Sequence, residues 1–183
     1  MADNNHYRLF RTAAGIAAIG WHDGRVTVLR LPAPTAPETE RALLRRLPDA
    51  MRTEPSAEVQ AVIDAIVRYF AEEPVDFFDV RVDLVAQPPF FARVYEQVRQ
   101  LGRGETTTYG AIAHALDVGP EYARAVGQAM AANPVPLIIP CHRVLAAGGA
   151  IGGFSAPGGA LSKARMLELE GVAIMPVQQG FDF

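Results

Sequence analysis

Apolar and polar positions in the first third of the chain follow a strand pattern and then a helical one. Residues 15–31, GIAAIGWHDGRVTVLRL, predict two strands that meet at Asp23-Gly24, a dipeptide typical of two-residue hairpins. A Pro-rich loop then leads into a short helix near residues 37–47. This stretch therefore predicts a hairpin followed by a helix.

A longer helix and a last strand complete the first part of the chain. Within residues 56–73, apolar side chains recur at positions 59, 62, 63, 66, 67 and 70, which is the stripe of an amphipathic helix. Ser56 is its expected N-cap. Residues 75–85, VDFFDVRVDLV, have the character of a strand. Pro88 and Pro89 then interrupt the pattern.

Helical patterns dominate the second part of the chain. Four helices are predicted, over residues 90–101, 108–116, 121–132 and 161–171. The second and third of them are short and are joined by a tight turn, DVGP, which favours a helix-turn-helix. The apolar run before Pro140, residues 137–139, is interpreted as a short buried strand. We therefore expect an α+β chain of two units, a structural one at 1–86 and a mainly helical one at 87–183.

Composition and charge narrow the classes of protein. The 183 residues are 50% apolar and 20% charged, with a formal net charge of −3, so nucleic-acid contact would need a local basic patch or helix ends. No apolar run reaches the roughly 20 residues of a membrane helix, and the N-terminus lacks a signal-peptide layout. A cytoplasmic protein is expected. One cysteine and four scattered histidines predict no disulfide, metal site or cofactor.

The single cysteine, Cys141, lies in the apolar stretch IIPCHRV. A lone cysteine in such a stretch is most often a small core hydrophobe. As a nucleophile it would need a base or a positive environment, because a free thiol is mostly protonated at neutral pH. His142 is a candidate base, and neighbouring residues of a strand face opposite ways, so contact depends on local geometry or a bridging water. An acceptor would orient His142, with Glu170 and Glu168 both candidates.

The motifs around this cysteine resemble those of the O6-alkylguanine-DNA alkyltransferases, also called methylated-DNA–protein-cysteine methyltransferases. The similar stretches are TTTYGAIA, the joined run ARAVGQAMAANPVPLIIPCHRV, and LELEG, in the same order, and the match covers about residues 88–172. The resemblance implies a small ribonuclease-H-like α/β unit followed by a mainly α unit with a helix-turn-helix. It also implies transfer of an alkyl group from guanine O6 in duplex DNA to the protein.

The resemblance assigns catalytic roles to four residues. Cys141 would accept the alkyl group, His142 would act as the base through a water, and Glu170 would orient His142. Tyr109 would contact the displaced base and its phosphate. A soft thiolate suits displacement at an alkyl carbon, and the thioether is too stable to reverse, so each molecule reacts once. The leaving guanine gains negative charge, which a donor such as the Tyr109 hydroxyl would stabilise.

DNA contacts are implied for the two short helices. Arg124 would fill the gap left when the target nucleotide is flipped out of the duplex. Small residues beside it would let the backbone approach the minor groove in a largely sequence-independent way. The small residues are Ala123, Ala125 and Gly127, and the further DNA contacts are Thr108 and Tyr109. The alternative is that the small residues allow helices to pack closely, and both can hold on different faces.

A base pocket is implied around the thiol. Its expected residues are Asn133, Pro136, Val144, Phe154, Ser155 and Lys163. The loop GGFSAPGG departs from the family pattern, because Phe154 replaces a tyrosine and Ala156-Pro157 look inserted. The loop is therefore expected to influence the range of alkyl groups that the protein accepts. It is also expected to influence whether O4-alkylthymine is a substrate.

Two other classes of function compete with single-turnover repair by a monomer acting on double-stranded DNA. A DNA-binding damage sensor or regulator would use the cysteine to signal alkylation, and predicts sequence-specific binding and a dimer. A thiol hydrolase using Cys141 and His142 would turn over repeatedly.

Overall fold

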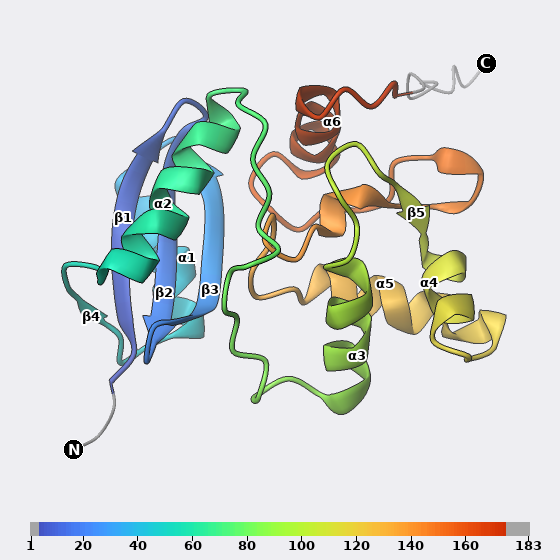
Figure 1. Cartoon of the computed structure of the whole chain (residues 1–183), viewed down its shortest axis with the longest axis horizontal. Helices are drawn as coiled ribbons and strands as arrows, with labels where there is room; N and C mark the ends of the chain where they lie inside the picture. The colour runs from blue at the N-terminus through green and yellow to red at the C-terminus, as the bar shows by residue number, and fades with distance from the viewer. Residues whose placement is uncertain (1–3, 175–183) are drawn as a thin grey trace, which may run out of the picture.

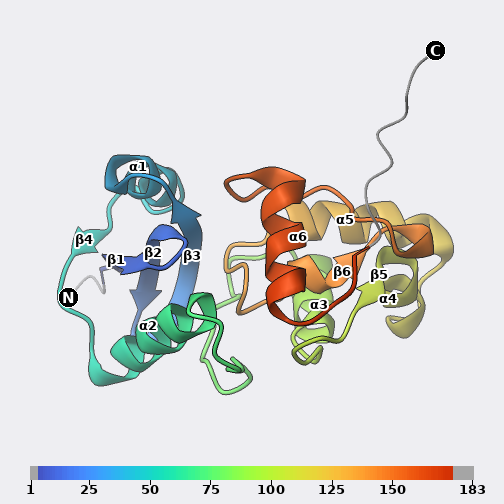
Figure 2. The ribbon, with the colours of Figure 1, turned by 90° about the horizontal axis from the view of Figure 1, so that it is seen from above.

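The computed structural model describes residues 4–174, and its first half is a sheet between two helices (Figures 1 and 2). The strands are β1 (His6–Thr12), β2 (Gly15–His22), β3 (Arg25–Ala33) and β4 (Met51–Arg52). Their order is β3-β2-β1-β4, with β1, β2 and β3 antiparallel and β4 parallel to β1. The predicted hairpin is confirmed, because Asp23 and Gly24 both have positive φ, 46° and 68°.

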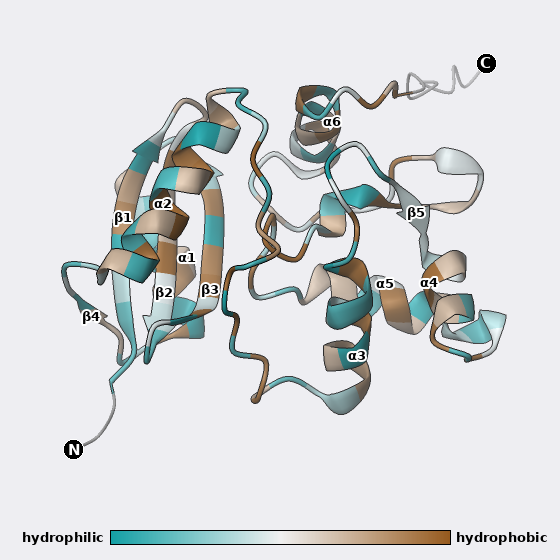
Figure 3. Ribbon diagram, in the orientation of Figure 1, coloured by the Kyte–Doolittle hydropathy of each residue, from teal (hydrophilic) through white to brown (hydrophobic). Residues whose placement is uncertain are grey.

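The two helices cover opposite faces of this sheet, as Figure 2 shows. Helix α1 (Ala36–Arg46) packs through Leu43 on Tyr7, Ala18 and Val28. Helix α2 (Ala57–Phe70) faces the other side, where Ile19 and Leu29 join the main core; the side chains of the strands alternate between the two faces. The alternation is visible as bands of apolar and polar colour along β3 in Figure 3. Both helix predictions and the Ser56 cap, which accepts the Val59 N–H at 3.3 Å, are confirmed.

The strand predicted at residues 75–85 is wrong. Only Val82 makes a bridge, to Val26, and the rest of the segment between α2 and α3 is irregular. Asp83 uses its carboxylate to accept the backbone N–H of Val85 at 2.9 Å, a local bond that competes with a strand ladder. The Arg99 guanidinium takes up the free carbonyl of Val80 at 2.7 Å. Side chains therefore satisfy much of this backbone.

The second half is mainly helical (Figure 1). Its helices are α3 (Pro89–Val98), α4 (Tyr109–Ala115), α5 (Ala123–Ala131) and α6 (Gly159–Leu169), with short 3₁₀ turns at Pro120–Tyr122, Cys141–Arg143 and Ala147–Gly149. A two-stranded parallel sheet, β5 (Thr107–Thr108) and β6 (Val144–Leu145), ties distant segments together. Helices α4 and α5 lie at the positions predicted for the helix-turn-helix.

Residues 137–139 are buried as predicted, but they do not form a strand. They belong to a tight turn closed by a bridge between Pro136 and Ile139, with Leu137 in the left-handed region at φ 75°. Prolines at 134, 136 and 140 remove backbone donors that a strand would need. A short apolar run fits a buried turn as well as a buried strand, so the hydrophobic pattern alone could not separate them.

One hydrophobic core runs through both halves of the molecule. The cluster that contains Ile19 and Leu29 of the sheet also contains Tyr95, Ile139 and Cys141. The α+β class is confirmed, whereas the division into units at 1–86 and 87–183 stays a prediction, and residues 175–183 of the second unit lie outside the described residues. Among the helices of residues 4–174, none has the length and apolar character to cross a bilayer.

Candidate functional site

The cysteine lies in a turn that is fixed to the start of α4. Cys141 opens a single 3₁₀ turn, Cys141–Arg143, and β6 follows directly. Because β6 pairs in parallel with β5, Val144 lies opposite Thr107 and Leu145 opposite Thr108. Thr108 is also the N-cap of α4, since its Oγ1 accepts the Ala111 N–H at 3.1 Å. The pairing therefore brings the thiol turn beside Tyr109, the first residue of α4.

The environment of the thiol is almost closed. Cys141 is 5% exposed, and its burial raises the pKa of the thiol above the ordinary value. The Asn133 amide and the Lys163 ammonium oppose that rise, because both stabilise a thiolate. Lys163 is itself buried, donates to the Val144 carbonyl at 2.7 Å and lies 5.9 Å above the ring of Tyr109.

Asn133 organises the turn that precedes the thiol. Its Nδ2 donates to the Ile139 carbonyl at 2.8 Å, and its Oδ1 accepts the Val135 N–H at 3.0 Å. One buried amide thus supplies a donor, which the prolines of this segment lack, and an acceptor. Asn133, predicted as a pocket residue, therefore also supports the turn that carries Cys141.

His142 faces Glu170 and away from solvent. Its Nε2 lies 2.7 Å from Glu170 Oε1, and both side chains are fully buried. Burial lowers the pKa of His142, although the Glu170 carboxylate opposes that shift. Its Nδ1 is also buried and has no hydrogen-bond partner among residues 4–174. Glu168, the other candidate acceptor, is exposed.

Two residues that the sequence reasoning did not assign hold Glu170 in place. Arg143 donates from Nε and Nη2 to the two carboxylate oxygens, each at 2.9 Å, and Tyr69 of α2 donates its hydroxyl to Oε1 at 2.9 Å. Burial alone would raise the pKa of Glu170, but the hydrogen bonds from His142 and Arg143 outweigh it and hold the pKa well below its ordinary value. Arg143 stood beside the motif in the sequence, whereas no local pattern could reveal Tyr69.

A hollow of about 550 Å³ opens over the thiol. Tyr109 of α4, Arg124 of α5 and the loop after β6 surround Cys141 there, and the lining residues from the predicted site are Tyr109, Ala123, Arg124, Gly127, Cys141, Phe154 and Ser155. Ala125 and Val144 do not line it; Val144 lies in the core and offers its carbonyl to Lys163. Burial and the neighbouring thiol both raise the pKa of Tyr109, which keeps its hydroxyl protonated as a donor.

Helix α5 has two different faces. A Cβ at Gly127 would meet nothing within 4 Å, so no neighbour requires a small residue there. Ala129, in contrast, is fully buried, and its carbonyl accepts the Tyr95 hydroxyl at 2.8 Å. Close packing therefore explains the small residue at 129, whereas the open face at Gly127, beside the exposed Arg124, is available to an outside partner.

The loop GGFSAPGG forms one wall of the site. Ser155 donates to the Ala131 carbonyl at 3.0 Å, which fixes the loop to the end of α5. A Cβ at Gly152 would collide with the Tyr109 hydroxyl, so the loop lies directly against that ring. Ala156 and Pro157 line a second, narrow cavity of about 30 Å³, together with Pro136 and Cys141.

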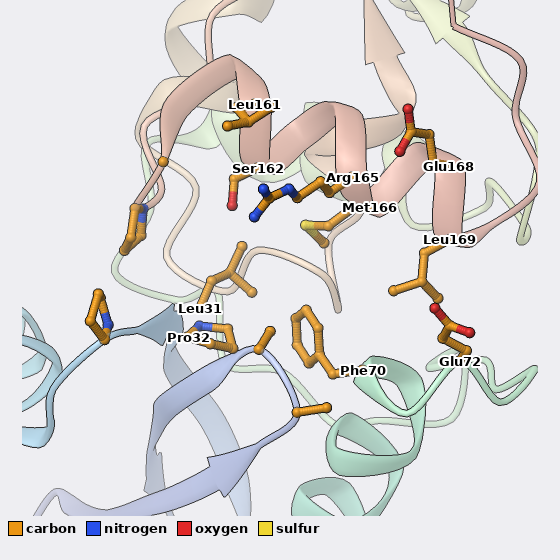
Figure 4. Close-up of a pocket in the computed structure, with 15 residues that line it drawn as sticks. Leu31, Pro32, Phe70, Glu72, Leu161, Ser162, Arg165, Met166, Glu168 and Leu169 are labelled. Atoms are coloured by element: carbon orange, nitrogen blue, oxygen red, sulfur yellow. The ribbon is translucent and has the colours of Figure 1, made fainter.

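A larger hollow, of about 670 Å³, lies away from the thiol (Figure 4). It is a groove between the sheet half and α6, where Leu31 and Phe70 face Met166. Neither Cys141 nor His142 lines it, so its size does not mark it as the reactive site. Among the described residues, no cluster of three or more His, Cys, Asp or Glu side chains could hold a metal ion.

Comparisons with known proteins agree with this geometry. Residues 89–172 match the family model "6-O-methylguanine DNA methyltransferase, DNA binding domain". The chain is 36% identical to a methylated-DNA–protein-cysteine methyltransferase of Mycobacterium tuberculosis, over 90% of this chain and 92% of the relative. It is 38% identical to a "DNA base-flipping protein" of Thermus thermophilus, over 77% and 97%. The crystal structure of M. tuberculosis OGT in complex with DNA is 34% identical, with a TM-score of 0.71 over 90% of this chain and 92% of that one.

Proposed function

The chain belongs to the O6-methylguanine-DNA methyltransferase family, and from this premise we propose that it repairs duplex DNA by moving the alkyl group of O6-alkylguanine onto Cys141. The observation that carries the proposal is the thiol itself. It lies at the base of a hollow between Tyr109 and Arg124, with the His142–Glu170 pair behind it. A thiol buried only as core filler would need none of these neighbours.

The hydrogen bonds support His142 as the proton acceptor. Glu170 is ionised, so it accepts a hydrogen bond from the His142 Nε2–H, and the neutral imidazole then carries its free lone pair on Nδ1. That atom has no partner among the described residues, so it is free to take the thiol proton through one bridging water. Lys163 stabilises the thiolate that results. His142 is thus the base and Glu170 the residue that sets its tautomer.

The transfer is a displacement at carbon. The thiolate forms a bond to the alkyl carbon while the carbon–O6 bond breaks, and its electron pair stays on guanine. The Tyr109 hydroxyl donates toward the charge that develops on the leaving base. The thioether product cannot return the alkyl group, so one protein molecule repairs one base.

Access to the target requires a flipped nucleotide, because guanine O6 lies inside the duplex. The open face of α5 meets the minor groove, and Arg124 occupies the gap in the base stack. Flipping costs a few kcal/mol, which these contacts offset in part. The protein acts on double-stranded DNA as a cytoplasmic monomer and uses no cofactor.

The proposal is tested by the mass of the intact protein. Incubation with a duplex oligonucleotide that carries O6-methylguanine is expected to add one methyl group, located on Cys141 by peptide mapping. Cys141→Ser is expected to gain nothing, since an alcohol is a poor nucleophile here. A folded protein that binds the duplex yet gains no mass contradicts repair and favours the damage-sensor alternative, which keeps DNA binding without transfer.

Arg124→Ala tests the role of the exposed arginine on α5. Transfer from duplex DNA is expected to slow far more, roughly tenfold or beyond, than transfer from free O6-benzylguanine, because only the duplex must be opened. Both rates are measured by time-resolved intact mass. Gln128→Ala, an exposed position on the same helix, serves as the control. Equal losses on the two substrates would rule out the stacking role of Arg124.

A further inference from the structure

Two arginines from the first half of the chain border the narrow cavity beside the thiol. The cavity of about 30 Å³ is lined by Cys141, Asn133 and Phe154 on one side and by Arg30 and Arg46 on the other. Its size is that of one water molecule or one carboxylate group. The repair reaction described above gives these two arginines no task.

Arg30 is held against the active-site turn by the edge of the sheet. Its neighbour Leu29 donates its N–H to the Pro134 carbonyl at 2.9 Å, so β3 lies alongside the turn that precedes the thiol. The Arg30 Nε is buried and has no hydrogen-bond partner among residues 4–174. Burial, together with the charges of Arg46 and Arg45, lowers the pKa of Arg30 to about 10, so Arg30 remains a cation at neutral pH.

The neighbours of Arg30 do not neutralise it. In the described part of the chain, neither Arg30 nor Arg45 nor Arg46 forms an ion pair. Arg46 instead reaches across to the second half, where its Nη1 donates to the Ala132 carbonyl at 3.3 Å. A partly buried guanidinium among like charges, with a buried Nε–H that has no acceptor, favours an anion as its partner.

The geometry of the transfer brings part of the substrate to this cavity. In a displacement, guanine O6 and the Cys141 sulfur lie on opposite sides of the reacting carbon, so the remainder of the alkyl group projects sideways. The hollow at Tyr109 and Arg124 takes the base. Cys141, Met130, Phe154 and Ser155 line both spaces, which makes the narrow cavity the adjoining space beside the sulfur.

We propose that the narrow cavity is a subsite for anionic alkyl substituents, in which Arg30 and Arg46 favour transfer of acid-bearing groups such as the carboxymethyl group of O6-carboxymethylguanine. The proposal rests on the function proposed above. A carboxylate beside a thiolate is otherwise repelled, and the two arginines offset that repulsion. They act on the choice of substrate and not on the bonds that change.

The step balances without a further reagent. The Cys141 sulfur forms a bond to the CH₂ carbon, and the bond from that carbon to O6 breaks. Guanine keeps the electron pair and finally gains the proton that the thiol lost, while the carboxylate is unchanged. The product is S-carboxymethylcysteine at position 141.

The experiment compares two duplexes that differ in one group. One carries O6-carboxymethylguanine and the other O6-propylguanine, which is similar in size and uncharged, at the same position. Rate constants for mass gain by the full-length protein are measured for each, and their ratio is the readout. The ratio cancels any general loss of binding or folding that a variant causes.

Arg30→Gln is expected to lower the carboxymethyl-to-propyl ratio roughly tenfold, the loss of one close charge in a partly buried site. Arg46→Gln is expected to lower the ratio by a smaller factor, because Arg46 is exposed. Arg30→Lys, which keeps the charge, is expected to retain most of the wild-type ratio. Arg41→Gln removes the same charge from an exposed position of α1 and is expected to leave the ratio unchanged.

A ratio that is the same in the wild type, in Arg46→Gln and in the Arg30→Gln/Arg46→Gln double variant overturns the subsite and leaves repair intact. If the double variant does not fold, Arg46→Gln alone decides, since its position is exposed. Failure of the wild type to gain mass from either duplex is a different result, which contradicts the proposed function itself.

Discussion

Glu170 gathers three side chains that come from distant parts of the sequence. His142 and Arg143 reach it from the thiol turn, and Tyr69 reaches it from α2, each at 2.7 to 2.9 Å. Arg143 is 5% exposed, so its charge depends on this one carboxylate. Glu170, which we propose orients the base, is therefore also the centre of a buried ionic group, so its loss is expected to act on stability as well as on transfer.

The stability that Glu170 contributes should depend on pH. Because its pKa is lowered in the folded protein, the contribution is fully present above the unfolded value of about 4.3 and is lost as the pH falls through the lower folded value. Glu170→Gln is expected to cost roughly 3 kcal/mol at pH 7, since Arg143 then lacks its counter-charge. Urea unfolding of the wild type and of Glu170→Gln at pH 7, 5 and 3.5 measures the difference in their free energies of unfolding. A difference that grows as the pH falls contradicts this assignment.

Lys163 should control how readily the thiol ionises. Lys163→Met removes the cation that opposes the burial-driven rise in the pKa of Cys141. Transfer from free O6-benzylguanine is expected to slow roughly tenfold at pH 7, and the pH profile to move to higher pH, because one unit of pKa is a tenfold change in thiolate. Arg165→Met, which removes an exposed cation from the same helix, is the control. An unshifted profile would leave Lys163 with a packing role only.

At the scale of single residues, the motif predicted the contact between His142 and Glu170 but not the residues that support it. Cys141, His142 and Glu170 lie together as the resemblance implied, and the structure distinguishes Glu170 from Glu168 by burial. Tyr69 could not be found, because it is 101 positions from Glu170 and sits in an ordinary helical stripe. Long-range partners of this kind follow from the fold and leave no local pattern.

Helix α5 separates its two tasks by face. Val126 and Ala129 point into the core, while Arg124 and Gly127 border the open hollow. Close packing accounts for Ala129 on the buried face, whereas approach to the groove stays a prediction for the open face at Gly127.

Gly127→Leu tests the open face. The melting temperature is expected to stay level or rise, because the new side chain meets nothing within 4 Å and glycine costs a helix about 1 kcal/mol. Affinity for duplex DNA is expected to fall, because a larger side chain then stands between the helix and the groove. Thermal unfolding and fluorescence anisotropy with a labelled duplex measure the two effects. Undiminished affinity would move the DNA contact away from this face.

Elements with a clear period were predicted from the sequence, and those fixed by turn chemistry were not. Within residues 4–174, the six α-helices lie where the sequence predicted them, to within a few residues at each end. Strand β1 was missed, and two apolar stretches taken as strands are irregular or turn-like. In these two stretches, residues 75–85 and 137–139, proline and side-chain hydrogen bonds determine the backbone conformation. A hydrophobic pattern does not contain that information.

At the scale of the whole molecule, the two halves share one core and several polar ties. Leu29 bonds to Pro134 through the backbone, Tyr69 bonds to Glu170, and the main hydrophobic cluster is continuous across the junction. The first half is therefore part of the support of the active-site turn, although the chemistry lies in the second.

We expect the halves to unfold together. Calorimetry should show one transition, and Tyr69→Phe should lower its midpoint while keeping it single, since the lost hydrogen bond to a charged group is worth about 1.5–3 kcal/mol. Tyr7→Phe, which removes a hydroxyl bonded to Glu40 within the first half, is the matched control. Two resolved transitions would mean that the junction contributes little.

The pairing of β5 with β6 has a consequence for how the work of repair is divided. The two residue pairs between β5 and β6 hold the turn that contains Cys141 and the start of α4 rigidly together. We therefore expect Cys141 and Tyr109 to keep their relative positions when a duplex binds. The conformational change that brings the reactants together is then expected in the DNA backbone, and not in the part of the protein that holds Cys141 and Tyr109.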